Sequence, residues 1–382
     1  MQMEREYQIC NRCIMDTSDP EITFDRNGLC NHCREFEEIT KKEWYPNAEG
    51  KKLLKTIIKD IKQFGRYKDY DCIIGLSGGV DSSYLAIKVN EMGLRPLVVH
   101  VDAGWNSELA VNNIENIVKY CEYDLHTHVV DWEEIKDLQV AYLRSGIANQ
   151  DIPQDHIFFS AMYHYAVKNS IRYVLTGGNL ASEAIFPNAW HNDAMDARNI
   201  KAIHKKFGTK KLKNYKLIGY FEYYFYYPFI KKMRVIRPLN YMPYNRHEAI
   251  QELKEKIGWK DYGRKHGESR FTKFFQNYYL PLRFGYDKRR PHYSSLIVSG
   301  QLTREEAVKE LDIPLYDERE LREDKEYFVK KLGLTNVEFE ELLHLKKHSF
   351  EEFPNCHSYF KAIKRIQGLI ESKTHRKWGR YS

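Results

Sequence analysis

The sequence of 382 residues lacks the features that mark membrane-spanning, secreted or low-complexity proteins. It contains no run of about 18 apolar residues, so we expect no membrane-spanning helix. Its beginning, MQMEREYQIC, has no apolar segment of the kind that secretory signals carry, so we expect a cytoplasmic protein. Internal repeats and low-complexity linkers are also absent, which leaves a chain of ordinary folded domains.

Neither the composition nor the charge is extreme. Apolar residues make up 42% of the chain and charged residues 30%, which is typical of globular proteins and argues against disorder. The length allows two or three domains with sizeable cores. A formal net charge of +7 permits anionic partners such as nucleotides, sugar nucleotides, RNA or a membrane surface, and it does not choose among them.

The chain has only seven cysteines, and four of them form two CxxC pairs with sixteen residues between the pairs: Cys10, Cys13, Cys30 and Cys33. Each pair places two sulfurs on one turn, so this spacing predicts a closed, structural zinc site. Disulfides are the alternative, and a cytosolic chain forms few of them. His32 lies inside the second pair, and we expect it to be a bystander. The other three cysteines, which we expect to be buried small apolar residues, are Cys72, Cys121 and Cys356.

Between residues 51 and 179 the hydrophobic pattern alternates between strands and helices. Strands are predicted at 71–76, 96–102, 125–131 and 172–179, and helices at 51–64, 82–93, 107–121, 132–144 and 156–169. This alternation predicts an α/β fold with a parallel sheet that is flanked by helices on both faces. In such sheets the functional residues follow the carboxyl ends of the strands.

The segment DCIIGLSGGVDSS (71–83) places small polar residues directly after a predicted strand. Gly78 and Gly79 allow the backbone to turn tightly and to approach an anion, and the following helix adds its positive N-terminus. The hydroxyl groups that can donate to the same phosphate oxygens belong to Ser77, Ser82 and Ser83. The negative charge of Asp81 cannot stabilise a bound phosphate directly, so we expect this residue to hold Mg²⁺ or to orient the loop. No lysine ends the loop, which distinguishes it from GxxxxGK[ST].

This segment resembles the SGGxDS loop of the ATP pyrophosphatase (PP-loop) enzymes, which cleave ATP between the α- and β-phosphates and adenylate a carbonyl oxygen. The resemblance implies an adenine nucleotide alpha-hydrolase-like fold. In HVDAGW, after the second strand, it places Asp102 at the adenosine, and an ordinary turn aspartate is the alternative. TGGNLASEA (176–184) resembles the second nucleotide motif, in which Thr176, Gly177, Gly178 and Asn179 close over the α-phosphate. Glu183 would then join Asp81 at the metal, although helix N-termini also attract acids.

Three features of the sequence narrow the range of possible acceptor substrates. The chain carries no GxCxG elbow and begins with Met-Gln, so we expect it to have no glutaminase of its own and to receive ammonia from elsewhere. Thiolases often need a further cysteine pair, and no CxxC pair occurs beyond the two at the predicted zinc site. Finally, CNRCIMDTSDPEITFD, SGGVDSS, TGGNLASEA and a late block at 265–307 together resemble the N-acetyl sugar amidotransferases of bacterial lipopolysaccharide O-antigen and flagellin-glycan biosynthesis, including the pseudaminic acid branch.

That resemblance implies that an acetamido group of a surface-glycan sugar becomes an acetamidino group through an adenylylated imidate, with ammonia from a separate glutaminase subunit. It implies ATP, Mg²⁺ and Zn²⁺, and no nucleic acid as partner. The late block is rich in cations, and we expect Lys273 to neutralise pyrophosphate or the substrate and to be catalytic with Asp81 and Glu183. A solvated basic face is the alternative. The aromatic residues that alternate with these cations predict a buried helix: Phe271, Phe274, Phe275, Tyr278 and Tyr279.

Two further stretches have open interpretations. Residues 190–198, WHNDAMDAR, either line the acceptor site or form an ordinary polar loop. Residues 217–230, LIGYFEYYFYYPFI, are predicted to be a core segment or a subunit interface, and a membrane-surface contact is the alternative because aromatic belts suit such interfaces. They are too short and too interrupted to span a bilayer.

We predict three domains: a zinc-binding module at 1–50, a PP-loop ATP-binding domain at 51–245 and a mainly helical region at 246–382. Two other functions stay open. One is a PP-loop tRNA-thiolating enzyme, which would bind tRNA with a steep salt dependence and require a cysteine. The other is a nucleotide-binding regulatory protein that binds ATP without releasing AMP. The presence of both Asp81 and Glu183 argues against this alternative.

Overall fold

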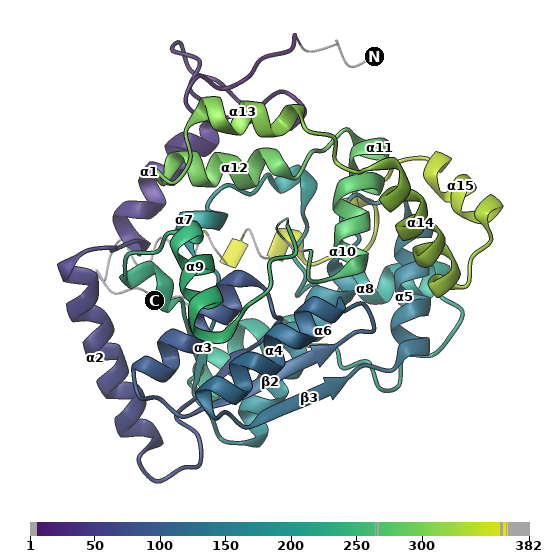
Figure 1. Cartoon of the computed structure of the whole chain (residues 1–382). Helices are drawn as coiled ribbons and strands as arrows, with labels where there is room; N and C mark the ends of the chain where they lie inside the picture. The colour runs from purple at the N-terminus through teal and green to yellow at the C-terminus, as the bar shows by residue number, and fades with distance from the viewer. Residues whose placement is uncertain (1–5, 264, 266, 360–361, 364, 366–382) are drawn as a thin grey trace.

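The computed structural model describes residues 6–263, 265, 267–359, 362–363 and 365 (Figure 1). In this part of the chain a single sheet has the strand order β3-β2-β1-β4-β5, and all neighbouring strands are parallel. The strands are β1 Cys72–Gly75, β2 Pro96–Asp102, β3 Leu125–Val129, β4 Tyr173–Leu175 and β5 Arg234–Ile236. The predicted α/β class with a parallel, helix-flanked sheet is confirmed.

The described α-helices are α1 Asn31–Glu43, α2 Ala48–Gly65, α3 Val80–Glu91, α4 Glu108–Cys121, α5 Trp132–Ser145, α6 Ile152–Lys168, α7 Leu180–Glu183, α8 Ala197–Phe207, α9 Arg246–Ile257, α10 Arg270–Phe274, α11 Leu280–Phe284, α12 Arg289–Val298, α13 Arg304–Asp312, α14 Glu318–Leu332 and α15 Asn336–His344. Two π-helices occupy Glu222–Ile230 and Phe275–Tyr279. Short 3₁₀ turns lie at Asn188–Trp190, Pro238–Tyr241 and Phe350–Glu352.

Most predicted elements are present with small shifts at their ends. Ser107 caps α4 as its sequence predicts, because its side chain accepts a hydrogen bond from the backbone N–H of Ala110. Strand β3 is shorter than predicted because Asp131 leaves the strand to cap α5. Helix α3 begins at Val80, two residues before the prediction. Helix α1 was not predicted. The strand β5 at the edge of the sheet was not predicted either, because it has only three residues.

The side chains of the sheet alternate between two cores. Ile73 and Val99 point to the face that α5, α6, α8 and the π-helix Glu222–Ile230 cover. Ile74 and Val98 point to the opposite face, which α2, α3, α4 and α9 cover. Because both faces are buried at the centre of the sheet, β1 and β4 consist of continuous apolar residues, whereas the edge strand β3 is only partly buried and contains His126, Thr127 and His128.

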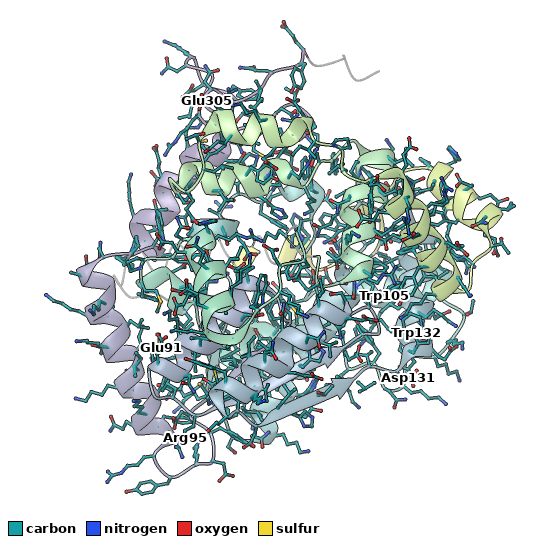
Figure 2. All side chains as sticks on the ribbon, viewed as in Figure 1. Glu91, Arg95, Trp105, Asp131, Trp132 and Glu305 are labelled. Atoms are coloured by element: carbon teal, nitrogen blue, oxygen red, sulfur yellow. The ribbon has the colours of Figure 1, made fainter. Side chains whose placement is uncertain are left out.

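The C-terminal helices lie beyond the ends of the strands, and the arrows of β2 and β3 in Figure 1 point toward α10 and α14. The aromatic helix predicted from Phe271, Phe274 and Phe275 is buried there. It packs around Trp105, whose ring centroid lies 5.7 Å from that of Trp132 (Figure 2). Among the described residues, no helix combines the length and apolar character needed to cross a membrane. The three domain boundaries stay a prediction.

Candidate active site and metal centre

The glycine loop between β1 and α3 forms the compact turn that its sequence predicts, and its binding of an anion stays a prediction. Gly78 has a φ of +79°, and Gly79 caps α3 with extended backbone. The hydroxyl groups of Ser77 and Ser82 lie 3.0 Å apart, and the N–H of Gly79 donates to Ser77 Oγ over 3.2 Å. Two of the three predicted phosphate-binding hydroxyls therefore meet at the helix N-terminus. Ser83 differs, because it is fully buried in α3.

Residues outside the motif hold this loop in place. The indole N–H of Trp259 donates to the carbonyl of Gly78 over 3.2 Å, and the N–H of Val80 donates to the hydroxyl of Tyr262 over 3.1 Å. A Cβ on Gly78 would lie 2.5 Å from the carbonyl oxygen of Ala110 in α4. The loop is thus held between the backbone of α4 and two aromatic side chains, and neither aromatic residue belongs to a motif from which its role could be predicted.

Replacing Gly78 with Ala should lower the free energy of unfolding by more than about 1–2 kcal/mol, the strain of the left-handed backbone alone, because the clash with Ala110 adds to it. Nucleotide binding should be lost with it. The control is Gly300→Ala, because Gly300 has the same φ of +79° and a Cβ there would meet nothing within 4 Å. Thermal unfolding and nucleotide titration of both variants measure the difference. Equal losses in the two variants would refute the steric argument.

The second glycine motif packs directly on the first. A Cβ on Gly177 would lie 2.8 Å from the backbone of Asp81. Thr176 Oγ1 accepts the N–H of Gly178 over 3.1 Å, and Asn179 donates its amide to Asp81 Oδ1 over 3.2 Å. The predicted nucleotide residues that follow β1 and β4 are therefore brought together at one edge of the sheet.

Asp81, Glu183 and Lys265 form the charged centre of this edge. Tyr244 and Asn179 donate to Asp81 Oδ1, and Lys265 Nζ lies 2.8 Å from Glu183 Oε1. Burial raises the pKa of Asp81, and the ammonium of Lys265 opposes this rise, while the carboxylate of Glu183 adds to it. Two carboxylates that face each other in this way can share Mg²⁺ with phosphate oxygens, and the donor set fits that metal.

The late block lies on the loop after β2. The N–H of Ser107 donates to the carbonyl of Glu268 over 2.8 Å, and the N–H of Arg270 donates to the carbonyl of Trp105 over 2.9 Å. Asn106 and Ser269 form an antiparallel bridge between these segments. In the same loop Asp102 Oδ1 accepts from the N–H of Gly104 over 2.8 Å and from the Asn106 amide over 3.1 Å. These bonds show that Asp102 shapes the turn; its contact with adenosine stays a prediction.

Lys273, the predicted catalytic cation, has a different environment from the one we expected. Its ammonium lies 2.7 Å from Asp324 and 2.6 Å from Glu320, both in α14. Arg270 pairs with the same Asp324 over 2.9 Å. Two carboxylates already neutralise Lys273, so these contacts join α10 to α14. Lys265 of the same block lies beside Asp81 and Glu183. The sequence alone did not indicate which cation of the block would take this position.

A group of polar side chains and one partly exposed aromatic ring, here called the Lys288 cluster, brings together residues just before α6, just before α12 and in the segment after the second glycine motif. Its members are Asn149, Asp151, Phe186, His191 and Lys288. The Lys288 ammonium lies 4.4 Å from the Phe186 ring centroid, and Asn149 Nδ2 lies 3.0 Å from His191 Nδ1. Lys288 is 8% exposed and has no hydrogen-bond partner for its ammonium among the described residues. Burial lowers the pKa of Lys288 to about 8 and that of His191 to about 3.

The Lys288 cluster is linked by hydrogen bonds to the loop after β2. Asp151 accepts from the Thr272 hydroxyl over 3.0 Å, and Thr272 hydrogen-bonds to Ser269, which bridges to the loop after β2. The charge of Lys265 also acts on both Asp81 and Lys288. A nucleotide at the loops and a second substrate at this cluster would thus be neighbours.

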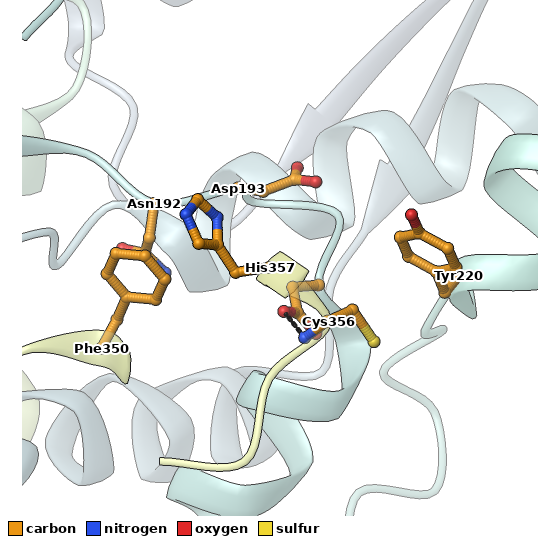
Figure 3. Close-up of a pocket in the computed structure, with 7 residues that line it drawn as sticks. Asn192, Asp193, Tyr220, Phe350, Cys356 and His357 are labelled. Atoms are coloured by element: carbon orange, nitrogen blue, oxygen red, sulfur yellow. Dashed lines mark hydrogen bonds between the residues drawn. The ribbon is translucent and has the colours of Figure 1, made fainter. Parts of the chain in front are cut away.

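The two carboxylates of the 190–198 stretch lie outside the Lys288 cluster. Asp193 and Asp196 line a small pocket with Asn192, Tyr220 and three residues of the C-terminal segment (Figure 3). Asp196 caps α8 and accepts the N–H of Cys356 over 2.6 Å. The structure therefore divides the predicted acceptor stretch: His191 joins the Lys288 cluster, and Asp196 fastens the C-terminal segment to α8.

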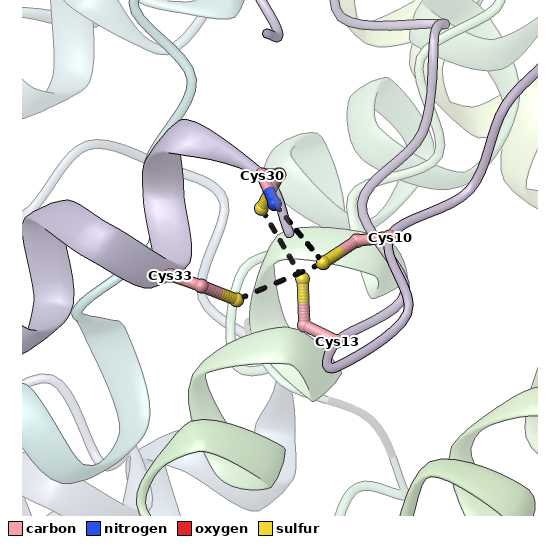
Figure 4. A group of neighbouring side chains, drawn as sticks. All are labelled: Cys10, Cys13, Cys30 and Cys33. Carbon is pink, nitrogen blue, oxygen red and sulfur yellow. Dashed lines mark hydrogen bonds between the residues drawn. The ribbon is translucent and has the colours of Figure 1, made fainter. Parts of the chain in front are cut away.

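The four N-terminal cysteines converge, and their sulfur atoms all lie within 4.8 Å of one another (Figure 4). The Cys10 and Cys33 sulfurs are 3.8 Å apart, and those of Cys13 and Cys30 are 3.7 Å apart. A tetrahedral zinc with Zn–S bonds of about 2.3 Å separates its sulfurs by about 3.8 Å. The spacing fits zinc and is far too long for disulfides. His32 instead pairs with buried Asp19 over 2.7 Å, so it is a bystander as predicted.

The cysteine module packs on the late block and on the segment after the second glycine motif. Its sulfurs share an apolar cluster with Ile185 and Trp190. Arg304 of α13 donates to the carbonyls of Cys10 and Cys13, and Ser294 of α12 accepts the N–H of Ile14 over 3.2 Å. Figure 1 shows α12 and α13 beside this module. The cysteine module therefore supports the position of the segment that carries Phe186 and His191.

The C-terminal part of the chain matches a known protein family. Residues 268–367 match the family described as "LPS biosynthesis protein WbpG-like, C-terminal domain". No curated protein matches the chain.

Solved structures that resemble the chain include an NH₃-dependent NAD synthetase from Campylobacter jejuni, with 15% identity, a TM-score of 0.27, and coverage of 35% of this chain and 58% of that one. NMN synthetase from Francisella tularensis has 12% identity, a TM-score of 0.35, and coverage of 78% and 98%. NAD⁺ synthetase from Burkholderia pseudomallei has 15% identity, a TM-score of 0.28, and coverage of 59% and 95%. This chain thus spans little more than half of the Campylobacter protein.

The TM-scores are low, so the assignment of the fold rests on the parallel sheet and on the two glycine motifs at its edge. The late block that carried the family resemblance in the sequence is the part that the WbpG-like match covers from Glu268 onward. The chain therefore has a parallel α/β fold with two glycine motifs at the carboxyl ends of its strands, and its residues 268–367 match the WbpG-like C-terminal domain of lipopolysaccharide biosynthesis proteins.

Proposed function

We propose that this protein uses ATP to convert an acetamido group of a bacterial surface-glycan sugar into an acetamidino group. One observation carries the proposal: the WbpG-like segment lies directly on the nucleotide loops. Glu268 pairs with the backbone of Ser107, and Lys265, just before the matched range, pairs with Glu183. The segment specific to lipopolysaccharide proteins and the ATP-type loop thus form one site.

The chemistry follows from the low reactivity of an amide. The acetamido oxygen attacks the α-phosphorus of ATP, pyrophosphate leaves, and an O-adenylyl imidate forms. Ammonia then adds to the imidate carbon and AMP departs with the former acetamido oxygen, so that C=O becomes C=NH. The chain contributes positioning, charge stabilisation and exclusion of water from the imidate.

Each part of the site has a role in this proposal. The loop at Ser77–Ser82 and the motif at Thr176–Asn179 hold the phosphates. Asp81 and Glu183 hold Mg²⁺, which would neutralise the pyrophosphate as it leaves. Lys265 stabilises the negative charge beside them. The Lys288 cluster receives the sugar, and a separate glutaminase subunit supplies ammonia.

The tRNA-thiolation alternative needs a reactive cysteine. Burial raises the pKa of Cys121 and of Cys356 to about 11, which keeps both thiols protonated at neutral pH. Cys72 is completely buried, and its pKa is also raised. These environments favour the amidotransferase over the thiolase.

The test is a mass-spectrometric assay with ATP, Mg²⁺, an ammonium salt and a panel of diacetamido sugars, free and nucleotide-linked. Bulk tRNA is run alongside. We expect AMP formation that depends on one sugar, together with replacement of its oxygen by NH. AMP formation stimulated by tRNA alone would support thiolation, and ATP binding without AMP in any mixture, with or without a glutaminase subunit, would support the regulatory alternative.

Replacing Lys288 with Met should raise the KM for the sugar at least about tenfold, because each buried charged contact is worth about 1.5–3 kcal/mol. The KM for ATP should change little. Lys288→Arg, which keeps the positive charge, is the matched control and should restore part of the affinity. If the Met variant instead raised the KM for ATP and left the sugar unaffected, Lys288 would belong to the nucleotide site.

A further inference from the structure

A buried histidine links the glycine loop to the loop after β2. His100 lies near the carboxyl end of β2 and is buried. Its Nδ1 lies 2.9 Å from the carbonyl oxygen of Leu76, the residue just before the glycine loop. Its Nε2 lies 3.0 Å from the side-chain nitrogen of Asn106, in the loop after β2. One imidazole ring therefore joins the two loops that follow the neighbouring strands β1 and β2.

The partners of His100 indicate which of its nitrogens carries the hydrogen. A carbonyl oxygen can only accept, so Nδ1 donates to Leu76. The side-chain nitrogen of Asn106 also lies 3.1 Å from Asp102 Oδ1, and a carboxylate oxygen accepts as well. Asn106 thus donates one hydrogen to His100 Nε2 and the other to Asp102. Because both hydrogens of this amide are used, the orientation of the Asn106 side chain is fixed.

This network orients the carboxylate of Asp102. Its Oδ1 accepts from the Asn106 amide and from the N–H of Gly104 over 2.8 Å, so both bonds hold the same oxygen. The direction of the other oxygen, Oδ2, follows from theirs. Asp102 is the last residue of β2, which pairs with β1, so this carboxylate lies at the same edge of the sheet as the glycine loop.

The strand order indicates which part of a nucleotide Asp102 would meet. The two glycine motifs follow β1 and β4, and β2 lies on the other side of β1. Neighbouring strands are about 4.8 Å apart, a step short enough for the ribose that is attached to the α-phosphate. A carboxylate repels phosphate and accepts from hydroxyl groups. A ribose hydroxyl is therefore the group of ATP that suits Asp102 at this distance from the phosphates.

We propose that His100 is a positioning residue that acts through Asn106 and orients Asp102 to accept a hydrogen bond from a ribose hydroxyl of ATP. This inference rests on the proposed function, because it concerns the nucleotide of the same site. His100 itself does not touch the nucleotide. Its effect is on the preference for the ribose hydroxyl, which a side chain with a merely structural role would not change.

The two nitrogens of His100 are tested one at a time. In His100→Asn the side-chain amide can still donate to Leu76 in the place of Nδ1, but it is too short to reach Asn106. In His100→Gln the side-chain oxygen can accept from Asn106 in the place of Nε2. The measurement is the affinity for ATP, 2′-deoxy-ATP and 3′-deoxy-ATP by calorimetry, with Mg²⁺ and without sugar.

The natural enzyme should prefer ATP over one of the two deoxy forms at least about tenfold, as expected for a hydrogen bond to a charged group. His100→Asn should bind ATP and that deoxy form almost equally, and His100→Gln should keep most of the preference. Asn106→Ala breaks the same link at a partly exposed position and should also lose it. The control, His344→Asn, makes the same change at the exposed end of α15 and should behave like the natural sequence.

Two results would overturn the proposal. One is a natural enzyme that does not bind ATP, or that binds ATP and both deoxy forms equally. The other is a preference that His100→Asn and Asn106→Ala leave unchanged while thermal unfolding shows a loss of stability, because His100 would then have a structural role alone. Failure of the proposed function gives a different result. Ribose-dependent binding of ATP that His100→Asn abolishes, without AMP formation in any sugar mixture, would support the role of His100 and contradict the amidotransferase.

Discussion

Asp81→Asn should reduce AMP formation at least about a hundredfold, the effect expected when a group that stabilises transition-state charge is removed. Asn has nearly the same size, so the contacts with Tyr244 and Asn179 are perturbed little. What the substitution removes is the negative charge that faces Lys265 and Glu183. The proposed Mg²⁺ would then have one carboxylate in place of two.

Release of AMP and pyrophosphate from ATP measures this effect, and thermal unfolding shows whether the variant is folded. The matched control is Asp60→Asn, the same chemical change at an exposed position in α2. It should leave AMP formation unchanged. If the Asp81→Asn enzyme formed AMP at the natural rate, the charge of Asp81 would not be needed for the reaction. Asp81 would then have the alternative role of orienting the loop.

Cys30→Ser should abolish stoichiometric zinc binding and lower the thermal unfolding temperature by more than about 10 °C, because the binding energy of a structural zinc is part of the folding energy. The Cys30 sulfur lies 3.7 Å from that of Cys13 in the middle of the apolar cluster that includes Trp190. Loss of the metal leaves buried sulfurs without their common partner. The loosened module would also release the segment that carries His191.

Metal content by mass spectrometry and a thermal unfolding scan check this prediction. Cys356→Ser is the matched control, because Cys356 is the isolated cysteine that is only partly buried. It should change the unfolding temperature by no more than about 1–2 °C, as most substitutions at partly exposed positions do. A zinc content that Cys30→Ser leaves unchanged would contradict the four-cysteine site.

Several parts of the site could be predicted because they depend on neighbours in the sequence. The glycine loop needs only a strand, two glycines and a helix start, and Gly78 and Gly79 adopt that arrangement. Ser107 caps its helix through a bond three residues along the chain. The cysteine pairs converge because each CxxC turn already places two sulfurs together.

Other parts could not be predicted, because they depend on contacts between distant segments. The cations of the late block look equivalent in the sequence, and only the packing of α10 on α14 gives Lys273 two carboxylate partners. Trp259 and Tyr262 support the glycine loop from about 180 positions away. Strand β5 is too short to be recognised without the neighbouring β4 that pairs with it.

The parallel α/β class, the two glycine motifs, the cysteine module and the resemblance to lipopolysaccharide enzymes could all be inferred from the amino-acid sequence. These follow from hydrophobic period, local turn geometry and motif spacing, all of which act over a few residues. Three features depend on the packing of the whole fold: Lys265 pairs with Glu183 beside Asp81, Lys288 is buried beside Phe186, and one face of the aromatic helix is exposed. Burial and charge partnership are properties of the packed chain, since the residues that create them come from segments far apart in sequence.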